Sequence, residues 1–243
     1  MLTNRQFLKT IQDSFEKFIE NGTSRSTGKL KPLHGAIAAD LAERIGEGYE
    51  VYSQGYGAGK ESRINGRYID KMVDIAVFNR TTGQPVAGIA VKFVMQNYSQ
   101  NSNNYFENML GETVNIRSAR CPYFQAFIIL DRLPYYKSSG ELTKWETFTA
   151  HNIEKYLRLA EDNVDICMHT PNKTLLFVVH LSPDTDVNVK DRKGYLAFYE
   201  SKKGKIQMEL SHNSYANFAV GGTVLMNDYE KFMEKIYHTI MSV

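Results

Sequence analysis

Residues 73–112, VDIAVFNRTTGQPVAGIAVKFVMQNYSQNSNNYFENMLGE, contain most of two apolar runs that decide how this chain is expected to fold. The runs, at 72–78 and 86–94, have the length of adjacent buried strands. Each carries one charged side chain, Asp74 in the first run and Lys92 in the second. A charge inside a strand core is costly unless it is paired or bound to a metal. We therefore expect Asp74 and Lys92 to mark a functional site.

Helical and strand patterns alternate around these two runs. Apolar periodicity and flanking polar residues predict helices at about 4–20, 33–45, 103–118, 147–160 and 228–241. Short apolar runs predict further strands near 49–53, 125–130 and 174–181. After residue 182 two β-like runs, YLAFYES and KIQMELS, flank a KKGK turn and predict a hairpin. The expected fold class is α/β: a mixed central β-sheet flanked by helices, with a small β-rich C-terminal appendage at about 182–243.

Bulk composition is ordinary for a soluble globular chain of 243 residues, and the net charge of +2 supports no strong claim about nucleic acid. Cys121 and Cys167 lie far apart without metal-like spacing, which is typical of free thiols in a reducing cytoplasm. The first residues lack the apolar core of a signal peptide, and no segment approaches the roughly 20 apolar residues of a membrane span. We expect a cytoplasmic protein that does not associate with membranes.

A strand carboxylate, a lysine on the next strand and an amide-rich helix that bears acids are what metal-assisted phosphodiester hydrolysis needs. The pattern of Asp74, Lys92 and the segment after them resembles the PD-(D/E)xK nuclease superfamily and, within it, the type II restriction endonucleases. The resemblance covers about 33–180, the expected catalytic core of a single nuclease domain spanning 1–243. It implies a restriction endonuclease-like fold, Mg²⁺ as the cofactor with Mn²⁺ able to substitute, double-stranded DNA as the substrate, and a homodimer with one active centre in each subunit.

The resemblance also implies roles for single residues. Asp74 would bridge one or two Mg²⁺ ions, and Lys92 would orient the attacking water and stabilise negative charge on phosphorus. The family usually has Asp or Glu two residues before the lysine, but this chain has Ala90 there. The missing acid could come from the following helix, where Glu107 and Glu112 lie at the two borders of the apolar face. Glu107 is the preferred second metal ligand because it is closer to the helix start and to Lys92.

Structural explanations compete with these roles. Glu107 has capping-box spacing from Asn104, and an acid in the first turn of a helix suits the helix dipole. Further acids could approach the metal: Asp70 lies just before Asp74, and Asp40 and Glu43 lie on the second helix. Asp70 is better explained as a loop residue that pairs with Arg67 or Lys71.

Amides and cations near the two strands are candidate DNA contacts. Amide side chains can bond adenine edges and phosphate oxygens, and Lys and Arg contact phosphates. The cations belong to a Gly- and cation-rich loop expected at 54–71. The expected DNA-binding residues are Gln96, Asn97, Gln100, Asn101, Asn103, Asn104, Lys60, Arg63 and Arg67. The structural alternative is that the amides form a turn and a helix cap and that the cations are solvated.

Other chemistries have weaker support. The six histidines show no metal-like spacing, and GYGAGK is not a phosphate-binding loop because Glu61 follows its lysine where Ser or Thr is needed. Two alternatives to a sequence-specific restriction enzyme stay open. One is a less specific anti-phage or repair nuclease, and the other is a catalytically degenerate member of the same fold that binds DNA, which Ala90 would explain.

Overall fold

A mixed β-sheet forms the centre of the protein. The computed structural model describes residues 1–22, 27–185, 189–213 and 221–242. The sheet has the order β1-β4-β5-β6-β9-β10, with β11 also pairing with β9. Its strands are β1 (Tyr49–Ser53), β4 (Ile75–Asn79), β5 (Pro85–Val94), β6 (Tyr123–Leu130), β9 (Lys173–Ser182), β10 (Gln207–Leu210) and β11 (Val224–Met226). Strand β4 pairs antiparallel with both β1 and β5, whereas β5, β6 and β9 run parallel to one another.

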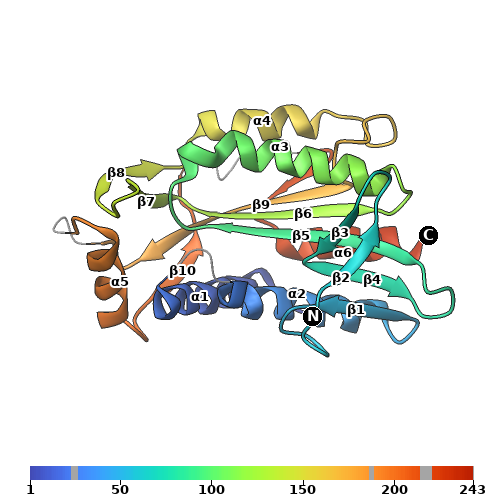
Figure 1. Ribbon diagram of the computed structural model, residues 1–243, viewed down its shortest axis with the longest axis horizontal. Helices are drawn as coiled ribbons and strands as arrows, with labels where there is room; N and C mark the ends of the chain where they lie inside the picture. The colour runs from blue at the N-terminus through green and yellow to red at the C-terminus, as the bar shows by residue number, and fades with distance from the viewer. Residues whose placement is uncertain (23–26, 186–188, 214–220, 243) are drawn as a thin grey trace.

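Helices cover both faces of this sheet (Figure 1). On one face lie α3 (Tyr98–Arg117) and α4 (Ala150–Ala160). On the other lie α1 (Asn4–Asn21), α2 (Lys31–Ile45) and α6 (Tyr229–Met241). Every residue of β6 is buried, as expected for a strand covered on both sides. The prediction of an α/β fold with a mixed central sheet flanked by helices is confirmed.

The first helix shows why the periodic segments could be predicted. Thr3 caps α1 through a capping box with Gln6, and Gly22 ends the helix with a left-handed φ of 63°. Phe7, Ile11 and Phe15 are fully buried on one face of the helix. Local capping and apolar spacing therefore agree, and the bounds of α1 lie within one residue of the prediction.

The predicted C-terminal appendage is wrong in two respects. YLAFYES is helical and lies in α5 (Arg192–Ser201), which Asp191 caps by accepting a hydrogen bond from the main-chain N–H of Gly194 at 2.7 Å. Tyr195 and Tyr199, one helical turn apart, are buried, and the ring of Tyr199 meets that of Phe15 on α1 at 5.1 Å. The second run supplies β10, which pairs with β9 in the main sheet. Among the described residues after 182, β10 and β11 therefore extend the central sheet, and α5 and α6 add to its helical layer.

The Gly- and cation-rich segment forms a hairpin, where the sequence predicts a loop. Strands β2 (Ser62–Asn65) and β3 (Asp70–Val73) pair with each other outside the main sheet, and the hairpin stands beside one end of α3 (Figure 1). The predicted strand at 72–78 is thus two strands, because the chain leaves the hairpin and enters β4 at Asp74. A second hairpin, β7 (Arg132–Tyr136) with β8 (Leu142–Thr147), has no counterpart in the prediction.

Helix α3 begins five residues before its predicted start. The carboxylate of Glu146, on β8, accepts hydrogen bonds from the main-chain N–H of Tyr98 at 2.7 Å and of Ser99 at 3.3 Å. A negative charge that satisfies these N–H groups stabilises a helix start. The cap comes from a residue 48 positions away in sequence, so local pattern could not reveal it.

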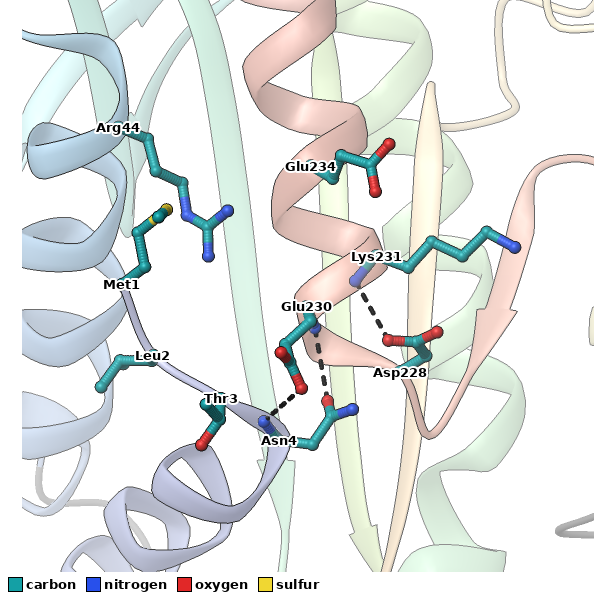
Figure 2. A pocket seen from close by; sticks show the side chains of 9 residues that line it. All are labelled: Met1, Leu2, Thr3, Asn4, Arg44, Asp228, Glu230, Lys231 and Glu234. Atoms are coloured by element: carbon teal, nitrogen blue, oxygen red, sulfur yellow. Dashed lines mark hydrogen bonds between the residues drawn. The ribbon is translucent and has the colours of Figure 1, made fainter.

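The starts of α1 and α6 meet at a cavity of about 820 Å³ (Figure 2). The side-chain oxygen of Asn4 accepts hydrogen bonds from the N–H of Tyr229 at 2.7 Å and of Glu230 at 3.3 Å. Behind this junction, the buried carboxylate of Asp40 accepts from the Tyr229 hydroxyl at 2.9 Å and from Arg44 at 3.1 Å. These polar groups satisfy one another, so we assign this cavity a structural role.

Candidate functional site

A cavity of about 300 Å³ lies between strands β5 and β6 and helix α3. It gathers three of the predicted site residues, Asp74, Lys92 and Glu112. Its full lining is Leu30, Asp74, Ala90, Val91, Lys92, Tyr105, Asn108, Met109, Glu112, Gln125 and Phe127. Polar groups that are far apart in sequence therefore converge on one hollow with apolar walls, which is typical of a ligand site.

Asp74 is held at the bend between β3 and β4. One carboxylate oxygen accepts the main-chain N–H of Val91 at 2.7 Å, and its own carbonyl accepts the Ser53 hydroxyl at 2.7 Å. Ile75 pairs with Ile89, so continuing this antiparallel register by one residue sets Asp74 across from Ala90. The short side chain of Ala90 leaves the space beside the carboxylate open.

The electrostatic surroundings of Asp74 favour binding of a cation. The pKa of Asp74 is raised to about 6: burial is the main cause and the nearby Glu112 contributes, while the Val91 N–H and the ammonium groups of Lys71 and Lys92 oppose the rise. A carboxylate that burial makes reluctant to ionise gains stability when a metal supplies positive charge.

Lys92 lines the cavity. Its apolar neighbours in the sequence had suggested that it is enclosed in the core, but it is not. Its side chain is exposed, and its ammonium lies 4.6 Å from the ring centre of Tyr105 on α3. Partial desolvation lowers the pKa of Lys92, and the negative charges of Asp74 and Glu112 oppose the shift. The ammonium is therefore positioned by a cation–π contact and remains available to an anionic ligand.

The structure brings Glu112 to this cavity and leaves Glu107 outside it. Glu112 accepts a hydrogen bond from Lys71 at 2.5 Å and another from the Tyr123 hydroxyl at 3.4 Å. Glu107 is exposed, because five residues along an α-helix turn the side chain by about 140°. Of the two helix acids, Glu112 is thus the one that reaches the cavity, and the preference for Glu107 over Glu112 finds no support in this geometry. The capping alternative for Glu107 is also wrong, since α3 begins at Tyr98.

His34 and Glu61 join Asp74, and the sequence analysis missed both. The potential ligand atoms of His34, Glu61 and Asp74 all lie within 4.8 Å of one another. His34 is buried on α2, and neither of its ring nitrogens has a hydrogen-bond partner among the residues that the structure describes. Burial lowers the pKa of His34 to about 4, so the ring is neutral at physiological pH, the form that ligates metals.

Two glycines allow α2 to approach the segment that carries Glu61. A Cβ atom on Gly35 would lie 2.5 Å from the carbonyl oxygen of Gly55, which itself has a φ of +81°. Only glycine tolerates both the close approach and the left-handed conformation. Burial, with Asp74 nearby, raises the pKa of Glu61. The histidine and the two carboxylates therefore form a cluster whose protons a metal would displace.

The donor set fits a divalent cation. Two carboxylates and one neutral imidazole are oxygen and nitrogen ligands, which suit Mn²⁺ and similar ions, while Mg²⁺ would rely on the carboxylates. The partnerless nitrogens of His34 give this fit a structural basis. Spacing rules could not find the set because its members are 27 and 13 residues apart; the one local signal was a histidine on the buried face of a helix.

Other predicted acids have different partners. Glu43 pairs with the amino group of Met1 at 2.6 Å, and Asp40 is committed to Arg44 and Tyr229. Asp70 is exposed at the start of β3. None of these three lines the cavity that holds Asp74, so the possible supporting roles of Asp40, Glu43 and Asp70 find no support in the geometry.

The predicted DNA-binding amides divide into two groups. Gln96, Asn97 and Asn101 line a second cavity, of about 170 Å³, which shares Lys92 and Tyr105 with the first. Asn97 also ties α3 to β7, donating to the carbonyl of Tyr136 at 2.8 Å. The other three amides, Gln100, Asn103 and Asn104, are exposed on the surface of α3.

Lysine side chains line both cavities, Lys92 in each and Lys29 in the second. Lys29, from the short 3-10 helix η1 (Thr27–Leu30), lines the second cavity together with Lys92. The pKa of Lys29 is lowered to about 8, mainly by burial and also by the positive charges of Lys92 and Arg192. The predicted contacts Lys60, Arg63 and Arg67 are exposed in and before the β2–β3 hairpin. The ammonium groups of Lys29 and Lys92 favour an anion in the second cavity that both of them line.

Comparisons with protein-family models, curated proteins and solved structures found nothing that matches this chain. Among the described residues, no helix is long and apolar enough to cross a membrane. The functional inference therefore rests on the geometry of the site.

Proposed function

We propose that this protein is a metal-dependent nuclease of restriction endonuclease-like fold that hydrolyses phosphodiester bonds of double-stranded DNA. One observation carries the proposal: a single cavity holds Asp74, Glu112 and Lys92, and His34 with Glu61 complete a ligand cluster around Asp74. A typical member of the superfamily has a carboxylate metal ligand at the position where this chain has Ala90. The cluster offers a replacement for that ligand from α2 and from the segment before β2.

The metal would be held by Asp74, Glu61 and His34. When bound, a divalent ion polarises phosphate oxygens and lowers the pKa of a water molecule. Mg²⁺ is the ion that the resemblance implies, with Mn²⁺ as a substitute. The imidazole of His34 makes Mn²⁺ the better match to the donors present.

The remaining residues would position the substrate. The ammonium of Lys92 lies at the boundary of the two cavities and would stabilise negative charge as it develops on phosphorus. Lys29 would hold a neighbouring phosphate in the smaller cavity. Glu112 offers a carboxylate oxygen that can orient the attacking water, while Lys71 and Tyr123 keep it in place.

Cleavage within a defined sequence by a homodimer, as in type II restriction enzymes, is the specific form of the proposal. Exposed Arg63 and Arg67 on the hairpin and exposed amides on α3 would contact DNA on either side of the cavity. Base specificity would come from the amides and phosphate affinity from the cations.

The test is incubation of the purified protein with unmethylated phage DNA and either Mg²⁺ or Mn²⁺. The variants are Lys92→Ala and Glu112→Gln, with Glu107→Gln as the matched control because it alters an exposed acid on the same helix. We expect discrete bands from the wild type and from Glu107→Gln, and intact DNA from the other two once circular dichroism confirms that they fold.

Equal cleavage by the wild type and Lys92→Ala would assign the activity to another site. Intact DNA with every enzyme and both metals would overturn the nuclease proposal, and retained DNA binding would then indicate the degenerate binder. A smear in place of bands would support a nuclease without sequence specificity.

A further inference from the structure

A second cluster of metal-binding side chains lies in the segment that joins α4 to β9. Asp162, Cys167 and His169 place one potential ligand atom each within 4.8 Å of the others. They share no residue with the candidate nuclease site. We propose that these three side chains form a binding site for Zn²⁺ or a chemically similar transition metal.

The spacing of two donors already suits a tetrahedral ion. The Nε2 atom of His169 lies 3.4 Å from a carboxylate oxygen of Asp162. Two such ligands bound to one Zn²⁺ at about 2.0–2.1 Å with tetrahedral angles lie roughly 3.4 Å apart. The sulfur of Cys167 lies within 4.8 Å of these two atoms and needs to approach them by at most about 1.2 Å, since Zn–S bonds are about 2.3 Å long. Rotation of the partly exposed Cys167 side chain can supply that movement.

The main chain of the segment is held in place independently of any ion. The guanidinium of Arg117, at the end of α3, donates to the carbonyls of Val164 at 2.6 Å, Cys167 at 2.8 Å and Thr170 at 2.7 Å. The Cys167 N–H also donates to the carbonyl of Asn163 at 2.8 Å. An ion would therefore meet ligands whose backbone is already ordered, which lowers the entropic cost of binding.

An outer contact orients the carboxylate. The hydroxyl of Thr170 donates to Asp162 at 2.5 Å, on the same oxygen that faces His169. Ligating carboxylates and imidazoles are generally fixed by such neighbouring hydrogen bonds. The fourth tetrahedral position has no protein donor among the described residues in this cluster and would be filled by water.

The ligand types select the metal. A thiolate and an imidazole prefer Zn²⁺ or Co²⁺ over Mg²⁺, whereas the nuclease cluster has no sulfur. The two sites should therefore differ in preference, and cobalt should distinguish them because only thiolate coordination gives a sulfur-to-cobalt charge-transfer band. An ordinary His169–Asp162 ion pair is the alternative, and it would not involve Cys167.

The experiment is titration of the metal-free full-length protein with Co²⁺, followed by near-ultraviolet and visible absorption and then by addition of Zn²⁺. We expect a thiolate charge-transfer band that saturates near one equivalent and disappears as Zn²⁺ displaces Co²⁺. Cys167→Ser should abolish the band, and His169→Ala should weaken Co²⁺ binding at least tenfold.

Two controls keep the result specific. Cys121→Ser removes the other thiol, which is buried away from the cluster, and Asp74→Asn disables the candidate nuclease site; both should retain the band. A wild type without the band, or a band that persists in Cys167→Ser, would overturn the proposal. Neither result depends on whether the protein cleaves DNA.

Discussion

Replacing Asn115 by alanine should loosen the β2–β3 hairpin and lower the free energy of unfolding by about 2 kcal/mol. The buried Asn115 side chain accepts hydrogen bonds from the N–H groups of Tyr68 at 2.9 Å and Ile69 at 3.2 Å, and donates to the carbonyl of Ile69 at 2.8 Å. Three such bonds contribute about 1 kcal/mol each. Tyr68 and Ile69 have exposed side chains, 75% and 65%, so water can partly replace the lost partner, which reduces the sum to about 2 kcal/mol.

Urea unfolding and amide hydrogen exchange would measure this effect. Exchange should accelerate more at Tyr68 and Ile69 than in α1, because the lost bonds are confined to the hairpin tip, whereas α1 reports only the change in global stability. Asn104→Ala is the control: it removes an exposed amide from the same helix and should change stability by less than about 0.5 kcal/mol. If Asn115→Ala matched this control in stability, or left exchange at Tyr68 and Ile69 unaltered, Asn115 would not be what holds the hairpin.

Three further predictions concern charge. In metal-free protein, burial lowers the pKa of His34 from an ordinary 6.5 to about 4, so its contribution to stability is lost as pH falls from about 6.5 to about 4. Burial raises the pKa of Asp74 from an ordinary 3.8 to about 6, so its contribution to stability grows as pH falls below about 6. The two trends oppose each other in the wild type. The free energy of unfolding of His34→Gln, measured in urea, should therefore rise by about 2 kcal/mol relative to that of the wild type as pH falls from 6 to 4. A difference between the two proteins that stays constant over this range would contradict the assignment. His34→Ala should raise the Mn²⁺ concentration for half-maximal cleavage about tenfold and change the Mg²⁺ requirement less, and equal shifts in metal titrations would argue against imidazole ligation. Replacing Arg63 and Arg67 together by alanine should reduce the slope of log DNA affinity against log salt concentration by about two phosphate contacts, as measured by fluorescence anisotropy in Ca²⁺. A slope equal to that of Arg5→Ala, a control at an exposed arginine, would exclude the hairpin from the interface.

The sequence was sufficient where local pattern and tertiary structure agree. Helix α1 has a cap, a periodic apolar face and a terminal glycine, all readable within 20 residues. Asp74 and Lys92 could be singled out because a charge within an apolar run conflicts with its neighbours. The cavity brings these two together, although Lys92 lies on the open side of its strand.

The failures have long-range causes. Glu146 sets the start of α3 from another strand, and the burial of Tyr195 and Tyr199 against α1 favours a helix in a segment whose residue types also suit a strand. His34 and Glu61 become neighbours only because α2 approaches the chain at Gly55. No sequence window contains these contacts.

The attachment of the β2–β3 hairpin to α3 has a consequence for where a nuclease of this design would cut. Asn115 fastens the hairpin tip at Tyr68 and Ile69, and Glu112 fastens Lys71 on β3, so both contacts come from within one turn of the same helix. Because β3 leads directly into Asp74, the distance from the tip to the candidate metal ligand is set by the protein. The hairpin would then act as a ruler, and the number of base pairs between the nucleotide it touches and the cleaved bond would stay constant when the DNA sequence between them changes.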